Sequence, residues 1–215
     1  MTTPANRARL ILSLRSAGIT NVSVLSAIER VPRELFVPET FRDQAYEDTA
    51  LPIGYGQTLS QPYIVAFMVA ALELNKNLKV LELGTGSGYH CSVLSHLCRR
   101  VYTVERHRAL LANAEQRFSE LQLNNVTTRA GDGMKGWAEQ APFDRISVSA
   151  ASKEIPQSLL DQLAIGGIMI LPVGGADRSQ VLTKISRTDS GFETQALIEV
   201  RFVPLLHGLA RDKSA

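Results

Sequence analysis

The sequence predicts an α/β fold: a doubly wound, mostly parallel sheet in an α/β/α sandwich, with an N-terminal helical subdomain and antiparallel strands at the C-terminal edge. Short apolar strands alternate with helical segments from residue 79 onwards, which is typical of a parallel sheet covered on both faces. Residues 180–205 instead contain two strand-like runs around Asp189–Gly191, which indicates an antiparallel hairpin.

The first part of the chain predicts helices. Segments 6–18 and 21–32 carry apolar residues at helical spacing and end in Gly18 and Pro32, two residue types that stop helices. Segment 33–48 is interrupted by proline and predicts short helical turns.

The central part predicts a regular succession of elements, beginning with a helix over 62–75 because Pro62 suits a first helical turn. This helix is expected to have an apolar face formed by Ile64, Phe67, Met68 and Ala71. The expected order is then strand 79–83, a glycine loop with a helix, strand 99–106, helix 108–122, strand and loop 125–133, strand 143–151, helix 155–167 and strand 168–174.

The chain is long enough for one substantial core, and no repeat or low-complexity linker divides it. We expect a single domain over 1–215 with three parts. Residues 1–60 form the helical subdomain and the candidate site segment, 61–175 the ligand-binding α/β core, and 176–215 the edge strands and tail.

The composition is that of an ordinary globular protein, with 45% hydrophobic and 20% charged residues and a net charge of +2. Lysine and arginine are scattered, so no nucleic-acid partner is expected. The apolar run Leu10–Leu12 is too short for a signal peptide, and no window approaches the roughly 20 apolar residues of a membrane span. We therefore expect a cytoplasmic protein without a membrane partner.

The cysteines and histidines predict neither a disulfide nor a metal site. Cys91 and Cys98 fall in one expected helix, which separates them by roughly 10 Å, whereas a disulfide needs Cα atoms within about 7 Å. The four histidines show no metal-ligand spacing, so their expected roles are solvated or in helix packing.

The strongest local signal is the glycine loop "LELGTGSGYH", which follows a strand and opens a helix. Gly84, Gly86 and Gly88 lack Cβ atoms, so the chain can turn tightly and a ligand can approach its backbone. Tyr89 stands where a dinucleotide fingerprint needs a small residue. Tyr89 and His90 also replace the lysine and hydroxyl residue of a Walker-type phosphate loop.

Acidic residues accompany the ends of three successive strands. Glu105 suits hydrogen bonds from both ribose hydroxyls, Glu82 could offer its charge to an ammonium group or to loop amides, and Asp132 could accept from an adenine amine beside Gly133. Taken singly, Glu105 could be a surface acid and Asp132 an Asx-turn residue. The candidate cofactor-binding residues are Glu82, Gly84, Thr85, Gly86, Ser87, Gly88, Glu105, Asp132 and Gly133.

The glycine loop, the acid suited to ribose and the "GDG" segment follow one another in this order. This arrangement resembles that of the S-adenosylmethionine-dependent methyltransferases, which have a Rossmann-like fold. Further segments are similar to the protein-L-isoaspartate O-methyltransferase family over roughly residues 30–205, and the most specific are "GQTLSQP" and "VRFVPL". The chain departs from that family's usual residues at Tyr55, which could narrow the mouth of the site, and more mildly at Ser149, Ser152 and Lys153.

The resemblance implies methyl transfer from S-adenosyl-L-methionine, with S-adenosyl-L-homocysteine as product, to the free α-carboxylate of L-isoaspartyl residues in damaged proteins and peptides. The ester then forms a succinimide, which restores aspartate part of the time. The family match also implies a monomer. It implies that Ser60 orients the carboxylate, that Gln57 and Thr58 shape the pocket, and that substrate backbone lies along "RFVPL", including Phe202 and Val203.

Alternatives remain at this point. By position alone, Ser60 also suits capping of the helix that begins near Pro62. A methyltransferase acting on RNA or DNA is a second possible function, although the sequence lacks both an NPPY-type motif and a basic stripe. A third is a non-catalytic module that binds the cofactor and recognises damaged protein.

Overall fold

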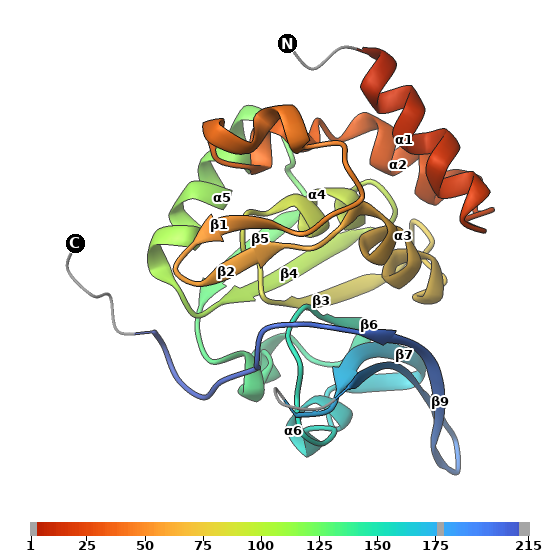
Figure 1. Ribbon diagram of the computed structural model, residues 1–215. Helices are drawn as coiled ribbons and strands as arrows, with labels where there is room; N and C mark the ends of the chain where they lie inside the picture. Colours follow the sequence, from red (N-terminus) through yellow and green to blue (C-terminus); the bar gives the residue numbers. More distant parts are fainter. Residues whose placement is uncertain (1–3, 176–178, 211–215) are drawn as a thin grey trace.

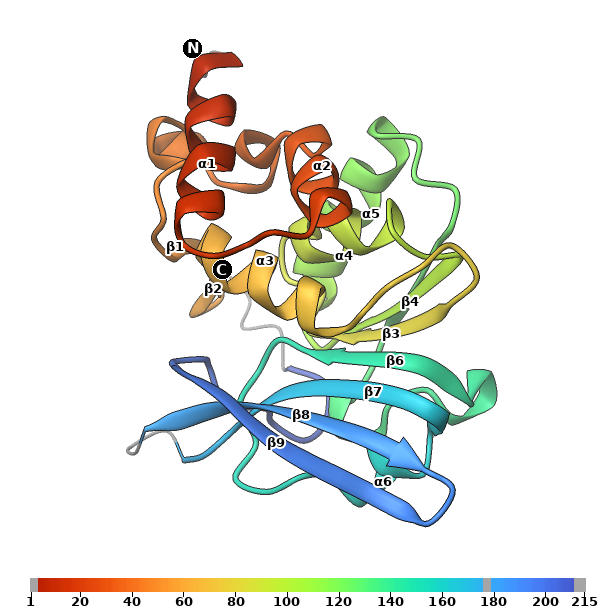
Figure 2. The ribbon, with the colours of Figure 1, turned by 90° about the vertical axis from the view of Figure 1, so that its right-hand side faces the viewer.

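The computed structural model describes residues 4–175 and 179–210. Its main sheet has seven strands in the order β5-β4-β3-β6-β7-β8-β9 (Figures 1 and 2). The first five in this order run parallel, and β8 and β9 are antiparallel additions at one edge, as the sequence predicts. The strands are β3 Lys79–Leu83, β4 Arg100–Glu105, β5 Val126–Ala130, β6 Phe143–Val148, β7 Leu163–Val173, β8 Gln180–Thr188 and β9 Gly191–Val200.

The order of the strands reverses at β3, because β4 and β5 lie on one side of it and β6 and β7 on the other. In an open α/β sheet of this kind, a crevice forms at the carboxyl ends of the strands where the order reverses. The glycine loop begins directly after β3, so the fold places it at this crevice.

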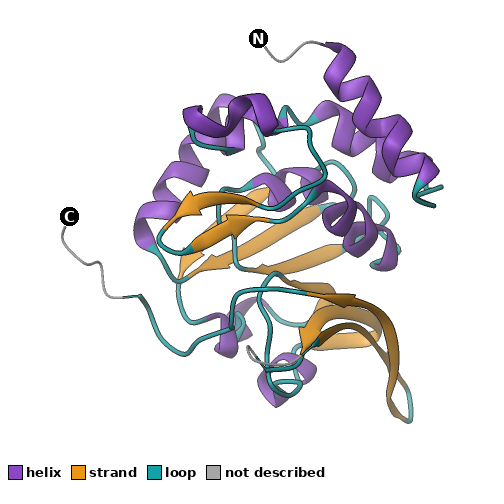
Figure 3. Ribbon diagram, viewed as in Figure 1, coloured by secondary structure: helices purple, strands orange, loops and turns teal. Residues whose placement is uncertain are grey.

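Helices cover the two faces of the sheet unequally (Figure 3). One face packs against α3 Pro62–Ala71, α4 Tyr89–Ser95 and α5 Arg108–Glu120. Among the described residues, the other face carries only α6 Gln157–Leu160 and the 3-10 turns η3 Gly133–Lys135 and η4 Ala138–Gln140. Alternation along β3 serves both faces, since Val80 packs with the first group and Leu81 with the second.

The N-terminal elements are α1 Pro4–Ser16, α2 Val22–Arg30 and the 3-10 helices η1 Arg33–Phe36 and η2 Glu39–Gln44, which agrees with the helices and short turns expected here. Asn21 caps α2 by accepting a hydrogen bond from the Val24 amide at 3.2 Å. Leu14 and Ile28 are buried in the same core cluster as α4, so these helices share the main core.

One local prediction was wrong. The helix expected over 155–167 ends at Leu160, because Leu163 already pairs with Phe143 as part of β7. Gly166, with φ +74°, lies where the register between β6 and β7 shifts, and glycine inside a strand often marks such a bulge.

The apolar face expected on α3 packs against the core, although most of it is only partly buried. Of the four residues expected there, only Met68 is buried, and Ile64, Phe67 and Ala71 are partly exposed. Almost every residue of this helix is apolar, so helical periodicity cannot distinguish one face from another. The residues that α3 buries are Pro62, Val65, Ala66, Met68 and Val69.

A short antiparallel hairpin, β1 Leu51–Gly54 and β2 Gln57–Leu59, precedes α3 and was not expected from the sequence. It lies over the carboxyl ends of the central strands (Figure 1).

Cys91 and Cys98 are buried free thiols. In the described part of the chain, no helix is long and apolar enough to cross a bilayer, and no cluster of three or more metal-binding side chains occurs.

Candidate active site

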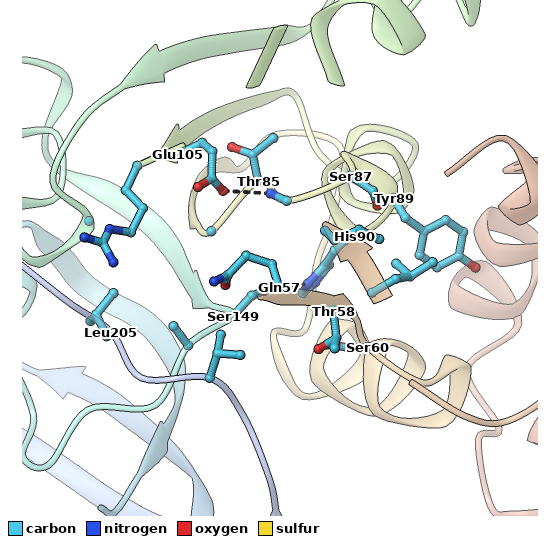
Figure 4. A pocket seen from close by; sticks show the side chains of 18 of the residues that line it. Gln57, Thr58, Ser60, Thr85, Ser87, Tyr89, His90, Glu105, Ser149 and Leu205 are labelled. Carbon is cyan, nitrogen blue, oxygen red and sulfur yellow. Dashed lines mark hydrogen bonds between the residues drawn. The ribbon is translucent and has the colours of Figure 1, made fainter. Parts of the chain in front are cut away.

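A pocket with an empty volume of about 810 Å³ lies between the glycine loop, the β1–β2 hairpin and the segment 203–206 (Figure 4). It is the crevice that the strand order predicts. Ten of the residues singled out from the sequence line it: Gln57, Thr58, Ser60, Gly84, Thr85, Gly86, Ser87, Glu105, Gly133 and Val203.

All three glycines of the loop have left-handed backbone conformations, but they serve different purposes. Gly86, at φ +55°, lines the pocket and faces Ile53 of the hairpin. Gly88 is not part of the pocket wall, and a Cβ there would lie 2.8 Å from the ring of Phe118 in α5. Gly88 therefore permits close packing of the loop on α5 rather than approach by a ligand.

Glu105 lies at the carboxyl end of β4, inside the pocket, and is 5% exposed. Its Oε2 accepts a hydrogen bond from the Gly86 amide at 2.8 Å (Figure 4), and its Oε1 accepts one from the His107 amide at 2.9 Å. These two bonds fix the carboxylate and leave each oxygen with further accepting capacity. Glu105 is therefore a buried, oriented acceptor and not a surface acid.

Glu82 is completely buried beneath the loop and does not line the pocket. Thr103 Oγ1 donates to its Oε2 at 2.6 Å and also lies 2.6 Å from Thr85 Oγ1. Burial raises the pKa of Glu82 to about 8, so the carboxyl group is mostly neutral at pH 7. Its hydrogen bond is with the threonine pair under the loop, and the expected service of its charge to a ligand stays a prediction.

His90 lines the pocket although sequence reasoning gave it only packing or solvated roles. Its Nδ1 lies 3.3 Å from Ser149 Oγ and 3.9 Å from Glu82 Oε1. Burial lowers the pKa of His90 to about 4, so the pocket contains a neutral imidazole at pH 7. The sequence feature that could have indicated a place in the pocket is the position of His90 in the first helical turn after the glycine loop.

Asp132 has the local role that was weighed as an alternative. Its Oδ1 accepts a hydrogen bond from the Met134 amide at 2.9 Å, and its Oδ2 lies 3.8 Å from His207 Nδ1. The carboxylate does not form part of the pocket wall, whereas Gly133 does. A Cβ at Gly133 would lie 3.3 Å from Leu205 Cδ1, so the absence of a side chain leaves room at this end of the pocket.

Ser60 lies between β2 and α3, and the helix-capping alternative is wrong for it. Asp48 Oδ1 instead accepts a hydrogen bond from the Tyr63 amide at 2.7 Å in the first turn of α3. The carbonyl of Ser60 accepts a bond from Arg33 at 2.7 Å. Within the described ranges its hydroxyl group forms no hydrogen bond, so it is free to bind a ligand.

A second pocket, with an empty volume of about 1350 Å³, adjoins the first along the segment that ends β9. Phe202 lines only this pocket, and Ile64 of α3 contributes to its apolar wall. The residues common to both pockets are Thr58, Ser60, Ser149 and Val203. The two pockets therefore meet at Ser60.

The main chain of "RFVPL" is largely engaged within the protein. The Phe202 amide donates to Gln180 Oε1 at 2.7 Å, and the Phe202 carbonyl accepts from Gln180 Nε2 at 3.1 Å. Val203 and Leu205 bond to both main-chain groups of Ala151. Continuous strand-like pairing of a peptide along this segment, as expected from the sequence, is therefore not available.

The fold, the glycine loop and the acid at the end of β4 define a Rossmann-like methyltransferase. A family model described as "Protein-L-isoaspartate(D-aspartate) O-methyltransferase (PCMT)" matches residues 5–210. The chain therefore belongs to the protein-L-isoaspartate O-methyltransferase family.

Relatives and solved structures agree with this assignment. The chain is 55% identical to the protein-L-isoaspartate O-methyltransferase of Rhodospirillum centenum (99% of this chain, 96% of that one) and 57% identical to that of Paramagnetospirillum magneticum (95% and 96%). A crystal structure of a putative protein-L-isoaspartate O-methyltransferase from Plasmodium falciparum, in complex with S-adenosyl-L-homocysteine, matches with a TM-score of 0.79 at 25% identity (92% and 97%). Another solved protein-L-isoaspartate O-methyltransferase matches with a TM-score of 0.83 at 28% identity (92% and 65%).

Proposed function

We propose that this protein transfers the methyl group of S-adenosyl-L-methionine to the free α-carboxylate of L-isoaspartyl residues in damaged proteins and peptides, and so initiates repair through a succinimide. Family membership over nearly the whole chain supports this activity. The observation that carries the assignment of the site is the free hydroxyl of Ser60 at the junction of two pockets.

The first pocket suits the nucleoside cofactor. The loop Gly84–Ser87 presents backbone without obstructing Cβ atoms at its glycines, Glu105 provides an oriented acceptor for ribose hydroxyls, and Gly133 leaves space for a ring. When bound, S-adenosylmethionine supplies a methyl group on a positively charged sulfur. His90 lines this pocket as a neutral imidazole, and so it adds no positive charge beside the sulfonium.

The second pocket suits the peptide, with the acceptor carboxylate at Ser60. A carboxylate is already anionic and nucleophilic at pH 7, and its transfer product is a neutral ester, so the protein does not have to supply a base. The protein has to align the carboxylate with the methyl group and to exclude water from the site. The Ser60 hydroxyl can donate one hydrogen bond to a carboxylate oxygen without opposing its charge, and Gln57 and Thr58 complete this wall.

We also propose that the protein acts as a monomer in the cytoplasm. The resemblance to the family supports the monomer, and two buried free thiols suit a reducing compartment.

Transfer of labelled methyl from S-adenosylmethionine to an isoaspartyl peptide and to its aspartyl twin tests the proposed activity. We expect labelling of the isoaspartyl peptide alone, because only that peptide presents the free α-carboxylate. Equal labelling of both peptides would contradict the proposal. Labelling of RNA or DNA but of neither peptide would favour the nucleic-acid alternative, and cofactor binding without any transfer would favour a non-catalytic module.

A further inference from the structure

We propose that Arg33 is a positioning residue for methyl transfer, which fixes the main chain of Ser60 from behind the pocket. This inference rests on the proposed function and extends it to a residue that does not touch the ligand. Arg33 lies in η1, is completely buried and does not line either pocket.

The guanidinium of Arg33 joins three separate segments. Its Nη2 donates to the carbonyl of Ser60 at 2.7 Å, and its Nε donates to the carbonyl of Ala45 at 2.8 Å. Its central carbon lies 4.7 Å from the ring centroid of Tyr89, which begins α4 directly after the glycine loop and lines the cofactor pocket. The side chain therefore connects the N-terminal subdomain to both walls of the site.

A requirement for packing alone does not explain this residue. None of the ion pairs formed by the described residues includes Arg33, so a buried cation is held by carbonyl oxygens and an aromatic face. Burying a charge is costly, and an apolar side chain of similar volume often stabilises a core at least as well. The planar fork of arginine, by contrast, can bond two carbonyl groups in fixed directions, which lysine cannot do.

The contacts around Ser60 show how the Arg33 guanidinium positions this residue. The carbonyl of Ser60 is held by Arg33, and the helix that follows is held by the bond from Tyr63 to Asp48. The main chain is thus fixed on both sides of a side chain whose hydroxyl is free. Since a displacement of about 1 Å from a productive geometry can cost roughly 100-fold in rate, loss of the Arg33 bond is expected to affect methyl transfer through Ser60.

Arg117 provides a useful contrast because it reaches η1 from α5. Its Nε donates to the carbonyl of Leu35 at 2.7 Å and its Nη1 to the carbonyl of Ser87 at 3.1 Å. Arg117 therefore supports the glycine loop, whereas Arg33 supports the serine. Variants of the two arginines should change different binding steps.

The test is a double-mutant cycle of Arg33→Lys and Ser60→Ala, measured as kcat and KM for an isoaspartyl peptide at saturating S-adenosylmethionine. We expect Arg33→Lys to lower kcat/KM by about 10- to 100-fold in the wild-type background and by less than about 2-fold when Ser60 is already alanine, since residues that act as a unit are non-additive. An equal loss in both backgrounds, or no loss, would overturn the proposal.

Arg7→Lys is the matched control, because Arg7 bonds to Tyr46 at 3.3 Å and Glu34 at 3.5 Å in the same subdomain but does not contact Ser60. It should leave kcat/KM unchanged even if it lowers Tm. Arg117→Lys should raise the dissociation constant of the cofactor by a larger factor than it raises the KM for the peptide. If Arg33→Lys is unfolded at the assay temperature, Arg33→Met, which fills a similar volume but offers no donor to the Ser60 carbonyl, replaces it in the cycle.

Failure of this inference is distinct from failure of the proposed function. A wild-type protein that labels isoaspartyl and aspartyl peptides equally would refute the function itself. A wild-type protein that is selective for the isoaspartyl peptide, with Arg33 variants that behave additively with Ser60→Ala, would refute only the role of Arg33.

Discussion

Asp48 and Ser60 divide two roles at the start of α3. Asp48, fifteen residues before the helix residue that it bonds, accepts from the Tyr63 amide, while Ser60 keeps its hydroxyl free beside both pockets. A serine that capped this helix would have its oxygen oriented towards backbone amides. Because an acid from a distant turn provides the cap, the serine hydroxyl remains available for a ligand.

This division predicts that substitutions of the two residues affect different properties of the protein. Asp48→Ala should lower the free energy of unfolding by about 1 kcal/mol, the usual value of a helix cap, and Asp48→Asn should retain most of it. Ser60→Ala should change stability by less than about 0.5 kcal/mol while lowering turnover and leaving cofactor binding near normal. Urea unfolding and methyl-transfer kinetics measure the two effects. A loss of stability on Ser60→Ala that matches Asp48→Ala would show that the serine is structural.

The sequence alone predicted some residues of this site and not others. The glycine loop and Glu105 could be recognised because their spacing along one βα unit is local. Arg33 and Asp48 could not, because their roles depend on contacts with residues 27 and 15 positions away. The surroundings of Glu82 could not be predicted either, since a sequence shows the presence of an acid but not its burial, which here raises its pKa.

At the scale of elements, the β1–β2 hairpin forms one wall of the site and depends on an unusual turn. Gly54 pairs with Gln57, so Tyr55 and Gly56 form a two-residue turn in which both residues have positive φ, +54° and +68°. This is the geometry of a type I′ turn, which prefers Asn-Gly. The Tyr55 ring lies 5.6 Å from that of His107, and Tyr55 lines neither of the two pockets.

Two substitutions in this turn should therefore act in opposite directions. Tyr55→Asn should raise the free energy of unfolding by about 1 kcal/mol, because asparagine tolerates the left-handed conformation better than tyrosine does. Gly56→Ala should lower it by about 1 kcal/mol for backbone reasons alone, since nothing lies within 4 Å of a Cβ at this position. Thermal and urea unfolding measure both. A destabilised Tyr55→Asn would mean that the contact with His107 outweighs the backbone strain.

The hairpin was not predicted and the helix containing α6 was predicted too long, and both errors concern short elements. Segments of three or four residues contain at most two repeats of strand spacing or about one helical turn, which is too little to define an element or its ends. The strand β2 has only three residues and α6 only four. The longer alternating core was predictable because each of its strands follows a helix or loop of recognisable composition.

At the scale of the whole molecule, the strand order determines where the site forms. The sheet reverses at β3, the glycine loop and Glu105 lie at the ends of β3 and β4, and the hairpin and the segment 203–206 close over them from opposite ends of the chain. The parallel core and its crevice follow from sequence patterns. The covering segments were assigned through the resemblance to a family, since their positions depend on contacts over long sequence separations.

The buried pair Glu82 and His90 makes the stability of the whole molecule depend on pH. Burial raises the pKa of Glu82 from 4.5 to about 8 and lowers that of His90 from 6.5 to about 4. Between pH 4.5 and 8 the folded state binds more protons at Glu82 than the unfolded state does, so Glu82 makes stability fall as pH rises. Between pH 4 and 6.5 the unfolded state binds more protons at His90, so His90 has the opposite effect.

The two effects oppose each other up to pH 6.5, and above it only the loss due to Glu82 remains. We therefore expect the free energy of unfolding to fall by about 2 kcal/mol between pH 6.5 and 8, at up to about 1.4 kcal/mol per pH unit. Glu82→Gln should remove this fall, whereas Glu139→Gln, at an exposed acid, should not. Urea unfolding across this range measures the slope. An unchanged slope in Glu82→Gln would show that Glu82 is ionised in the folded protein, and its charge would then again be available to the loop above it.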